Sequence, residues 1–510
     1  MGSHNHIANG GPHSHAERAT HRLVSLQLGS IFLLKRWKRT WFAQCPKQTA
    51  DPSHSGAGLV TIDILPDEIL LEIFGFYRVI TSLEAWHTLV HVCRRWRAIV
   101  FASPLRLDLR LICTSGTPAK ETLHVWPILP IEIWATGHCG MPQRRVAENV
   151  IAVLKHNDRV CRISFQDLPS FVLEMFAAVM QKPFLTLTHL EVIPLDKTRF
   201  PKAFLGGSAP CLRSCILQNI RFPEIWKLLL TARHLVDLRL WRIPHSTYIP
   251  PKALVMCLSM MPDLKRFEVD LRSLSPQSRP DLPDQPIRCL PPLRRIVHHT
   301  LTYFSYSGIS EYMEDLVSHI DMPRLEQVNI TFVNRVIFNS PRLYDFLPRP
   351  ETLNAYKGAV MVFEGDAVHL KPNTSPLTLG ISCTRLDGQL SSMIRACDPL
   401  LPLVSTLERL ELVIGALPGP RWKDYMGNAR WLALLRQFKA LEELYLANGL
   451  APLVAPALQE LAGEDASEVL PALRYLIIGW PQPSRPTRGA IGKFVAARQL
   501  SGRPVAVCGL

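Results

Sequence analysis

Apolar residues recur at helical spacing over residues 62–100, the first regular pattern along the chain. Leu65-Pro66-Asp67-Glu68 predicts a helix start, because proline fits the first turn and two carboxylates lie at the positive end of the helix dipole. One face of this helix then carries Ile69, Leu70, Ile73, Phe74 and Tyr77. A second helix is predicted to begin near Ser82 and to stop at Ser103-Pro104, with a stripe of Trp86, Leu89, Val92, Cys93, Trp96, Ile99 and Val100.

Two short amphipathic helices cannot bury both of their apolar faces against each other alone. They either pack on the rest of the chain or present an apolar surface to a partner helix. Spacing alone leaves both alternatives open.

The residue types of this segment resemble the F-box. The matching pattern is Leu65-Pro66-x-x-Ile69-Leu70-x-x-Ile73-Phe74, followed by Leu89-x-x-Val92-Cys93-x-x-Trp96. The resemblance implies that residues 58–104 form a small helical bundle that docks on a Skp-type adaptor and, through it, on a cullin scaffold. The residues it implies for adaptor binding are Leu65, Pro66, Ile69, Leu70, Ile73, Phe74, Leu89, Val92, Cys93 and Trp96.

A wider likeness connects the chain to a large fungal family of F-box proteins. It is carried by residues 101–111, 114–118, 125–127, 406–412, 455–461 and 494–502. Members of that family are known mostly by sequence. The likeness therefore implies an architecture and leaves the target open.

A recurring L-x-x-L-x-L pattern fills most of residues 105–510. Its clear copies start at Leu187, Leu235, Leu264, Leu325, Leu407, Leu441 and Leu473, and weaker copies start at Val160, Leu212 and Leu293. Most starts lie roughly 23–34 residues apart, near the period of leucine-rich repeats. The wide gap after Leu325 has room for two degenerate units near Leu353 and Leu377, and residues 273–286 are predicted to be a proline-rich inserted loop.

The fold class predicted from these patterns is an α/β repeat, in which a small all-α module precedes an irregular leucine-rich-repeat solenoid over residues 105–510. Each unit would supply one strand and a return segment, and stacking of units would make the core. A helix with Thr487 as its N-cap is expected to cap the array, with Ile491, Phe494, Val495 and Leu500 as apolar residues and Gly502 as its stop.

Strand pleating then predicts which side chains meet a target. In L-x-x-L-x-L the leucines face inward, so positions 3, 5 and 7 face outward. For three consecutive copies this places Arg239, Trp241, Arg266, Glu268, Arg295 and His299 among the exposed residues and makes them target-binding candidates. A solvated face on which the arginines pair with Asp237, Glu268 and Asp270 is an equally weighted alternative.

Residues 1–57 differ in composition from the rest of the chain and are predicted to be a disordered, basic and histidine-rich tail. The net charge of the chain is +14, and much of the excess lies in residues 17–49, where Glu17 is the one acidic residue. The apolar run Leu23–Leu34 is too short to span a bilayer. Membrane-surface or nucleic-acid association through this tail remains an alternative function, although neither a membrane nor a nucleic acid is the expected partner.

The chain has 12 scattered cysteines and no C-x-x-C, which is typical of buried thiols in the cytoplasm or nucleus. Walker A, G-x-G-x-x-G, G-x-S-x-G and H-E-x-x-H motifs are absent. The pairs His298-His299 and His138-Cys139 are adjacent residues, which on a strand point to opposite faces and make no metal site. We therefore expect no enzymatic activity, no metal and no cofactor.

Together these features predict a substrate-recognition adaptor of a Skp–cullin–F-box ubiquitin ligase, whose helical module binds the Skp-type adaptor and whose repeats bind a protein target. A repeat scaffold that serves another assembly without ubiquitin transfer is the alternative reading. The identity of the target, its degradation signal and the biological process lie beyond the sequence.

Overall fold

A computed structural model describes residues 62–509 apart from 82–84, 126–127, 138–142, 272–294, 334–345, 347–356, 365–366, 374–376, 383–404, 416–426, 448, 462–468 and 480–483. The chain divides into two compact units, Met1–Ile69 and Leu70–Leu510. The predicted tail, the loop at 273–286, the pair His138-Cys139 and the repeat starts at Leu293 and Leu353 lie outside the described residues. Within the described part of the chain, no helix is long and apolar enough to cross a membrane.

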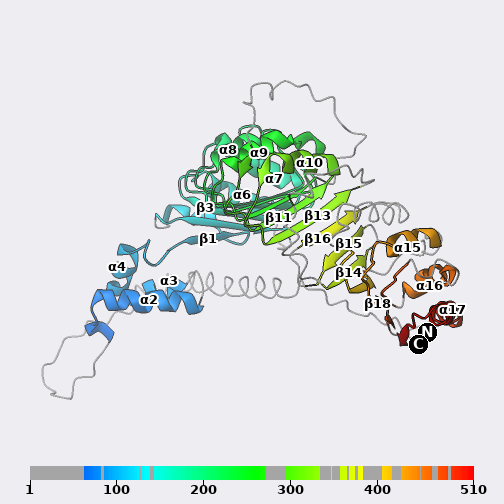
Figure 1. The fold of residues 1–510 in the computed structure, drawn as a ribbon. Helices are drawn as coiled ribbons and strands as arrows, with labels where there is room; N and C mark the ends of the chain where they lie inside the picture. Colours follow the sequence, from blue (N-terminus) through cyan, green and yellow to red (C-terminus); the bar gives the residue numbers. More distant parts are fainter. Residues whose placement is uncertain are drawn as a thin grey trace, which may run out of the picture. The chain divides into compact units, whose positions relative to one another are not determined.

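Helices account for the first described elements (Figure 1). A 3-10 helix, η1 (Ile62–Ile64), precedes α2 (Asp67–Thr81), which begins with two acidic residues as predicted. The single second helix expected from Ser82 is wrong. It is two helices, α3 (Ala85–Val92) and α4 (Arg94–Ala102), because Cys93 adopts an extended conformation and accepts the Trp96 N–H at its sulfur.

Aromatic side chains fill the core of this helical region. Phe74 is fully buried, and its ring lies 4.7 Å from the ring of Trp96. Trp86 lies 5.9 Å from Phe101 and donates its indole N–H to the carbonyl of Arg110 at 3.0 Å. The last bond ties α3 to the start of the sheet that follows.

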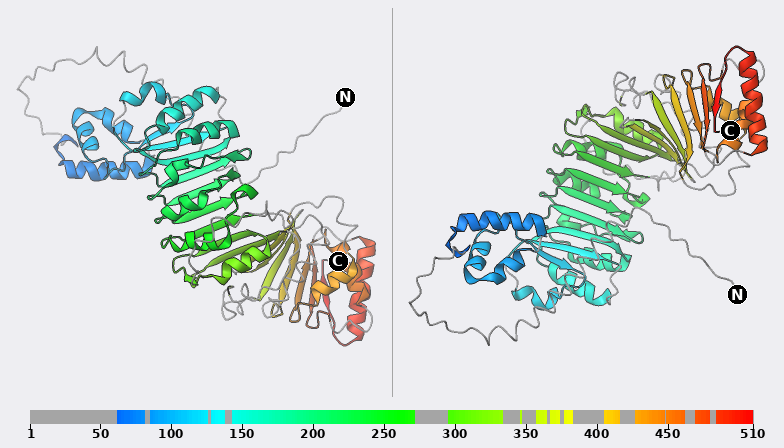
Figure 2. Two further views of the ribbon diagram at one scale, coloured as in Figure 1. Left: turned by 90° about the horizontal axis from the view of Figure 1, so that it is seen from above. Right: turned by 90° about the horizontal axis from the view of Figure 1, so that it is seen from below.

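One sheet of 16 strands runs through the described residues after the helices (Figures 1 and 2). Its spatial order is β1-β2-β3-β4-β6-β8-β9-β11-β13-β16-β15-β14-β17-β18-β19-β20. The strands as far as β13 are β1 (Leu111–Thr114), β2 (Ile131–Thr136), β3 (Val160–Leu168), β4 (His189–Pro194), β6 (Ser214–Gln218), β8 (Asp237–Trp241), β9 (Arg266–Asp270), β11 (Tyr303–Gly308) and β13 (Gln327–Val333). Neighbouring strands in this stretch are all parallel.

Buried residues stack across these strands in register, as the repeat pattern predicts. Leu190 pairs with Cys215, Cys215 with Leu238, and Leu238 with Phe267. These residues are almost fully buried. Strands begin within a few residues of the repeat starts at Val160, Leu187, Leu212, Leu235, Leu264, Leu325, Leu407, Leu441 and Leu473, which confirms those units.

The repeat predicted at Leu293 is wrong. Ile296–Val297 forms β10, which pairs with β12 (Ile320–Asp321) in a separate two-stranded sheet. The strand that follows β9 in the main sheet is β11, with buried Leu301, Phe304 and Tyr306 at the three repeat positions. Aromatic residues replace two of the leucines there, and the leucine pattern therefore missed this unit.

The middle of the array departs from a simple repeat. The hairpin β14 (Gly358–Phe363) and β15 (Ala367–Pro372) leads into β16 (Leu377–Ser382). β15 is antiparallel to both neighbours, while β16 pairs in parallel with β13 and β14 pairs in parallel with β17 (Arg409–Ile414). The unit near Leu377 is confirmed as a strand, although three strands enter the sheet here in reversed order.

Helices on one face of the sheet cover its buried side chains (Figures 1 and 2). Those over the first half are α5 (Ala119–Thr122), α6 (Gln143–Leu154), α7 (Ser170–Val179), α8 (Ile225–Thr231), α9 (Pro251–Ser259) and α10 (Ser310–Ser318). Helices α6, α7 and α10 contact the strands next to them. Two-residue strands β5 (Thr198–Arg199) and β7 (Ile220–Arg221) form a small additional sheet.

The end of the chain forms the predicted cap. After β18 (Glu443–Leu446) and β19 (Tyr475–Ile478), α17 (Arg485–Leu500) packs on α16 (Ala451–Glu460), which follows α15 (Asn428–Leu435). β20 (Ala506–Cys508) then pairs with β19. The N-cap is Ser484 and not Thr487, because helical geometry already begins at Arg485.

Candidate docking surfaces

Exposed apolar side chains gather along one face of α2. Ile69, Ile73 and Phe76 are 47%, 39% and 69% exposed. Their spacing of four and three residues places them along one face of the helix. Leu70 and Phe74, on another face, are fully buried. The helix therefore holds the core with one apolar face and leaves a second apolar face to solvent.

The structure divides the residues that the F-box resemblance assigned to adaptor binding. Leu70, Phe74 and Leu89 are core residues, and Leu65, Cys93 and Trp96 are half-buried; the exposed members are Pro66, Ile69, Ile73 and Val92. Phe76 was missed, although its position seven residues after Ile69 could have placed it on that face. The four exposed members and Phe76 are candidate contact residues on this module, and we call them the module surface.

Polar groups at the edge of this module are partly shielded from water. The Trp96 indole N–H is buried and has no hydrogen-bond partner within the described structure. Burial lowers the pKa of His91, and the neighbouring Arg97 lowers that pKa further. His91 is therefore neutral at pH 7, and the charge of this edge comes from arginines.

The second candidate surface is the side of the sheet opposite the helices. From β4 to β13, half-buried side chains alternate with buried ones along the main-sheet strands, except that Asp270 of β9 is buried and Gln327 of β13 is exposed. We call the side of the main-sheet strands β2 to β13 that carries these half-buried residues the open face. It includes Asp270 and the other positions in register with those residues. Arg239, Trp241, Arg266 and Glu268 lie on it, as predicted.

Arg295 and His299 do not belong to the open face. Both lie outside the main-sheet strands, on either side of the short strand β10. The next strand of the main sheet instead presents Tyr303 and Ser305 in register with Arg266 and Glu268. The error arose because the repeat predicted at Leu293 was expected to supply the strand beside β9, whereas β11 is the strand that pairs there.

Charged and aromatic groups on β8 and β9 are bound to one another. Arg239 donates to both carboxylate oxygens of Asp237, at 3.0 and 2.8 Å, and these bonds raise the pKa of Arg239. Glu268 accepts the Trp241 indole N–H at 3.0 Å and an Arg266 N–H at 3.1 Å. The arginines therefore pair with carboxylates, which was one of the two alternatives for this face.

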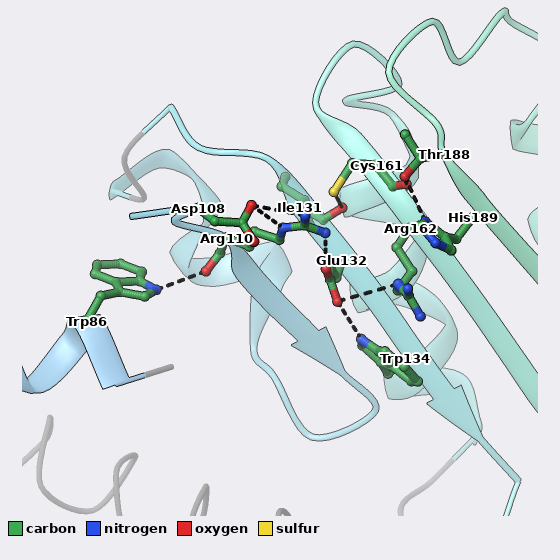
Figure 3. Close-up of polar contacts among 10 residues, drawn as sticks. All are labelled: Trp86, Asp108, Arg110, Ile131, Glu132, Trp134, Cys161, Arg162, Thr188 and His189. Atoms are coloured by element: carbon green, nitrogen blue, oxygen red, sulfur yellow. Dashed lines mark hydrogen bonds and ion pairs between the residues drawn. The ribbon is translucent and has the colours of Figure 1, made fainter. Parts of the chain in front are cut away.

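A similar cluster on β2 and β3 was not anticipated (Figure 3). Glu132 is 2% exposed and accepts hydrogen bonds from Arg110 at 2.5 Å and from the Trp134 indole at 3.2 Å. Arg162 lies 3.9 Å from Glu132 and 5.4 Å from the centre of the Trp134 ring. The predicted repeat copies include none at β2, so no repeat signal indicated the outward positions of Glu132 and Trp134; only Arg162 falls in a weak copy, the one that starts at Val160.

Both clusters join the same three residue types. In each, a glutamate accepts an indole N–H and an arginine lies over the tryptophan ring, with Arg239 5.9 Å from the centre of the Trp241 ring. The bonds fix the indole planes, which therefore lose little conformational entropy when a partner binds. We call them the first cluster (Arg110, Glu132, Trp134 and Arg162) and the second cluster (Asp237, Arg239, Trp241, Arg266 and Glu268).

The described residues form no group of three or more metal-ligating side chains. Burial raises the pKa of the thiols of Cys113, Cys215 and Cys257 to about 12. Those thiols are therefore protonated at neutral pH, which is typical of core cysteines.

Comparisons with known proteins agree with the helical module. Residues 62–107 match the F-box-like family. No curated protein sequence matches the chain. Among solved structures, the leucine-rich repeat-containing protein LegL7 from Legionella pneumophila is similar, with 12% identity over 78% of this chain and 98% of that chain at a TM-score of 0.24. The chain carries an F-box-like domain followed by a leucine-rich-repeat region, the latter assigned from its stacked strands.

Proposed function

We propose that this F-box-like protein is the substrate-recognition subunit of a Skp–cullin–F-box ubiquitin ligase. Its module would bind a Skp-type adaptor in the cytoplasm or nucleus, and its repeat region would hold a protein target. The ubiquitin-transfer chemistry would reside in the partners, so the chain itself would act without a catalytic site, metal or cofactor.

The exposed apolar side chains of α2, within an F-box-like domain, carry this proposal. Transfer of an aliphatic side chain from water to an interface contributes roughly 1.5–3 kcal/mol when burial is complete. Several such residues along one helix face are suited to a partner helix, which inserts between them as helices do in soluble cores. The open face is the matching surface for the target, because its side chains remain accessible beside a rigid sheet.

Replacement of Ile69 and Ile73 by aspartate tests the adaptor half of the proposal. Both side chains are exposed, so we expect the double variant to stay folded while its affinity for a Skp-type adaptor falls by more than about thirtyfold. Leu185→Asp is the control, since Leu185 is also an exposed aliphatic residue but lies in the repeat region. Co-purification and calorimetry with a purified adaptor supply the measurement.

Two results would contradict the proposal in different ways. Failure of the wild-type chain to bind any Skp-type adaptor would reject the ligase assignment altogether. Adaptor binding without recruitment of a cullin or transfer of ubiquitin, in a reconstituted reaction, would favour the non-ligase scaffold.

A further inference from the structure

The strip of the open face between the two clusters has its own chemistry. It consists of β4 and β6, and it presents His189, Glu191 and Ile193 from the first strand and Ser214 and Ile216 from the second. The two isoleucines are half-buried and therefore offer aliphatic surface to a partner. The strip thus has a tryptophan-bearing strand beyond each side, and it combines two isoleucines with polar residues, among which Glu191 is the one carboxylate.

That carboxylate, Glu191, differs from the other carboxylates of the open face. It accepts a hydrogen bond from the Ser164 hydroxyl at 2.8 Å, and the described residues give it no cationic partner. Its direct cross-strand neighbours are Ser164 and Ile216. Burial lowers the pKa of His189, and Arg162 lowers that pKa further, so this histidine does not supply a charge at pH 7. Glu191 is therefore a half-buried negative charge that a cation would stabilise.

The charged residues of the open face around Glu191 are also more often acidic than basic. The five carboxylates Glu132, Glu191, Asp237, Glu268 and Asp270 outnumber the four arginines Arg110, Arg162, Arg239 and Arg266 of the two clusters, although the whole chain carries +14. Each of these arginines also lies within ion-pair distance of a carboxylate. A phosphorylated ligand would meet arginines that are already paired, whereas a lysine or arginine side chain would meet an excess of carboxylates.

Strand spacing gives the dimensions of the strip. Neighbouring strands lie about 4.8 Å apart, and two steps separate β4 from β2 on one side and from β8 on the other. Glu191 therefore lies roughly 10 Å from each tryptophan-bearing strand. A polypeptide in the polyproline II conformation advances about 3.1 Å per residue and turns every third side chain to the same side, so it would cover either distance in about three residues.

We infer that the open face binds an unphosphorylated target segment in the polyproline II conformation, with a lysine or arginine on Glu191 and an apolar side chain three residues away on each side, against Trp134 and Trp241. This deepens the proposed function and rests on it for the role of the segment as a recognition signal. Both indoles are held in place by hydrogen bonds to glutamates, as the first cluster in Figure 3 shows for Trp134. The segment thus binds surfaces that are already ordered.

The experiment uses the full chain and a phage-displayed library of random seven-residue peptides. We expect enrichment of sequences with apolar residues at positions 1 and 7 and lysine or arginine at position 4. Enriched peptides are then synthesised with lysine, glutamine, glutamate or phosphoserine at position 4, and their affinities are measured by fluorescence polarisation. The lysine peptide should bind about tenfold more tightly than the glutamine peptide, and the acidic peptides more weakly still.

Variants assign the preference to the named residues. Glu191→Gln should remove the difference between the lysine and glutamine peptides, whereas Glu411→Gln, a half-buried glutamate of β17 beyond the inserted hairpin, should retain it. Trp134→Ala and Trp241→Ala should each relax the preference for an apolar residue at one end of the peptide.

Several results would overturn the inference: no enriched peptide, tighter binding of the phosphoserine peptide, or a lysine preference that survives Glu191→Gln. Adaptor binding measured on the same preparation separates this test from that of the proposed function. Loss of adaptor binding with intact lysine selectivity would reject the ligase role alone, and the opposite pattern would reject only the peptide chemistry.

Discussion

At the scale of single residues, Glu132 is the least exposed charged side chain among the described residues of the open face. Its carboxylate is almost completely withdrawn from water, yet it is charge-paired with Arg110 and hydrogen-bonded to Trp134. A buried ion pair loses hydration energy that is recovered only while both partners are present. Removal of the glutamate therefore leaves a guanidinium and an indole N–H without their acceptor.

Glu132→Leu is accordingly expected to destabilise the protein by about 2–4 kcal/mol. Glu72→Leu serves as a matched control, because Glu72 pairs with Arg106 at an exposed position, where such pairs contribute less than about 1 kcal/mol. Urea denaturation followed by circular dichroism measures both. Equal effects of the two substitutions would show that burial of Glu132 has no energetic consequence.

At the scale of elements, the junction between α3 and α4 shows how one residue divides a helix. The apolar stripe runs through Cys93 at uninterrupted helical spacing, so periodicity predicts a single helix there. The backbone of Cys93 is extended, and its sulfur accepts the Trp96 N–H at 3.4 Å. An N-cap satisfies one of the backbone donors that a helix start leaves without a partner.

Substitution of Cys93 tests this cap. Serine is a stronger N-cap acceptor than cysteine, and we expect Cys93→Ser to preserve or raise the melting temperature. Cys93→Ala, which lacks an acceptor, should cost about 0.5–2 kcal/mol. Differential scanning calorimetry distinguishes the two variants, and a lower melting temperature for serine than for alanine would mean that the sulfur acts through packing and not as a cap.

At the scale of the whole molecule, a repeat array needs its ends closed. Each repeat buries its apolar face against its neighbours, so a terminal repeat without a cap exposes core residues. The last described helix supplies this cover, with Ile491 and Phe494 fully buried and Leu500 almost fully exposed. α17 therefore has one face for the array and another for solvent.

Phe494→Asp places a charge in that buried face and should open the cap. We expect self-association and a lower melting temperature, measured by size-exclusion chromatography with light scattering and by calorimetry. Leu500→Asp in the same helix is the matched control and should leave both properties unchanged. Monomeric, fully stable Phe494→Asp protein would mean that α17 does not close the core.

Local patterns in the sequence located the helical module, most of the stacked strands and the cap helix, although they merged α3 and α4 into one helix. The leucines of L-x-x-L-x-L mark a strand with one buried face, as Leu238 and Leu240 show. The same rule placed Arg239 and Trp241 on the open face correctly. It did not find β11, whose buried positions are aromatic, and so it placed Arg295 and His299 wrongly.

Tertiary structure alone decided the relations between distant segments. Periodicity places Leu70 and Ile73 on one apolar helix, but only packing shows that the first is core and the second is exposed. The reversed order of β14, β15 and β16 and the bond from Trp241 to Glu268, 27 residues apart, arise from strand pairing. A local pattern fixes which side of an element is apolar, whereas burial, register and charge pairing depend on which other segments meet that side.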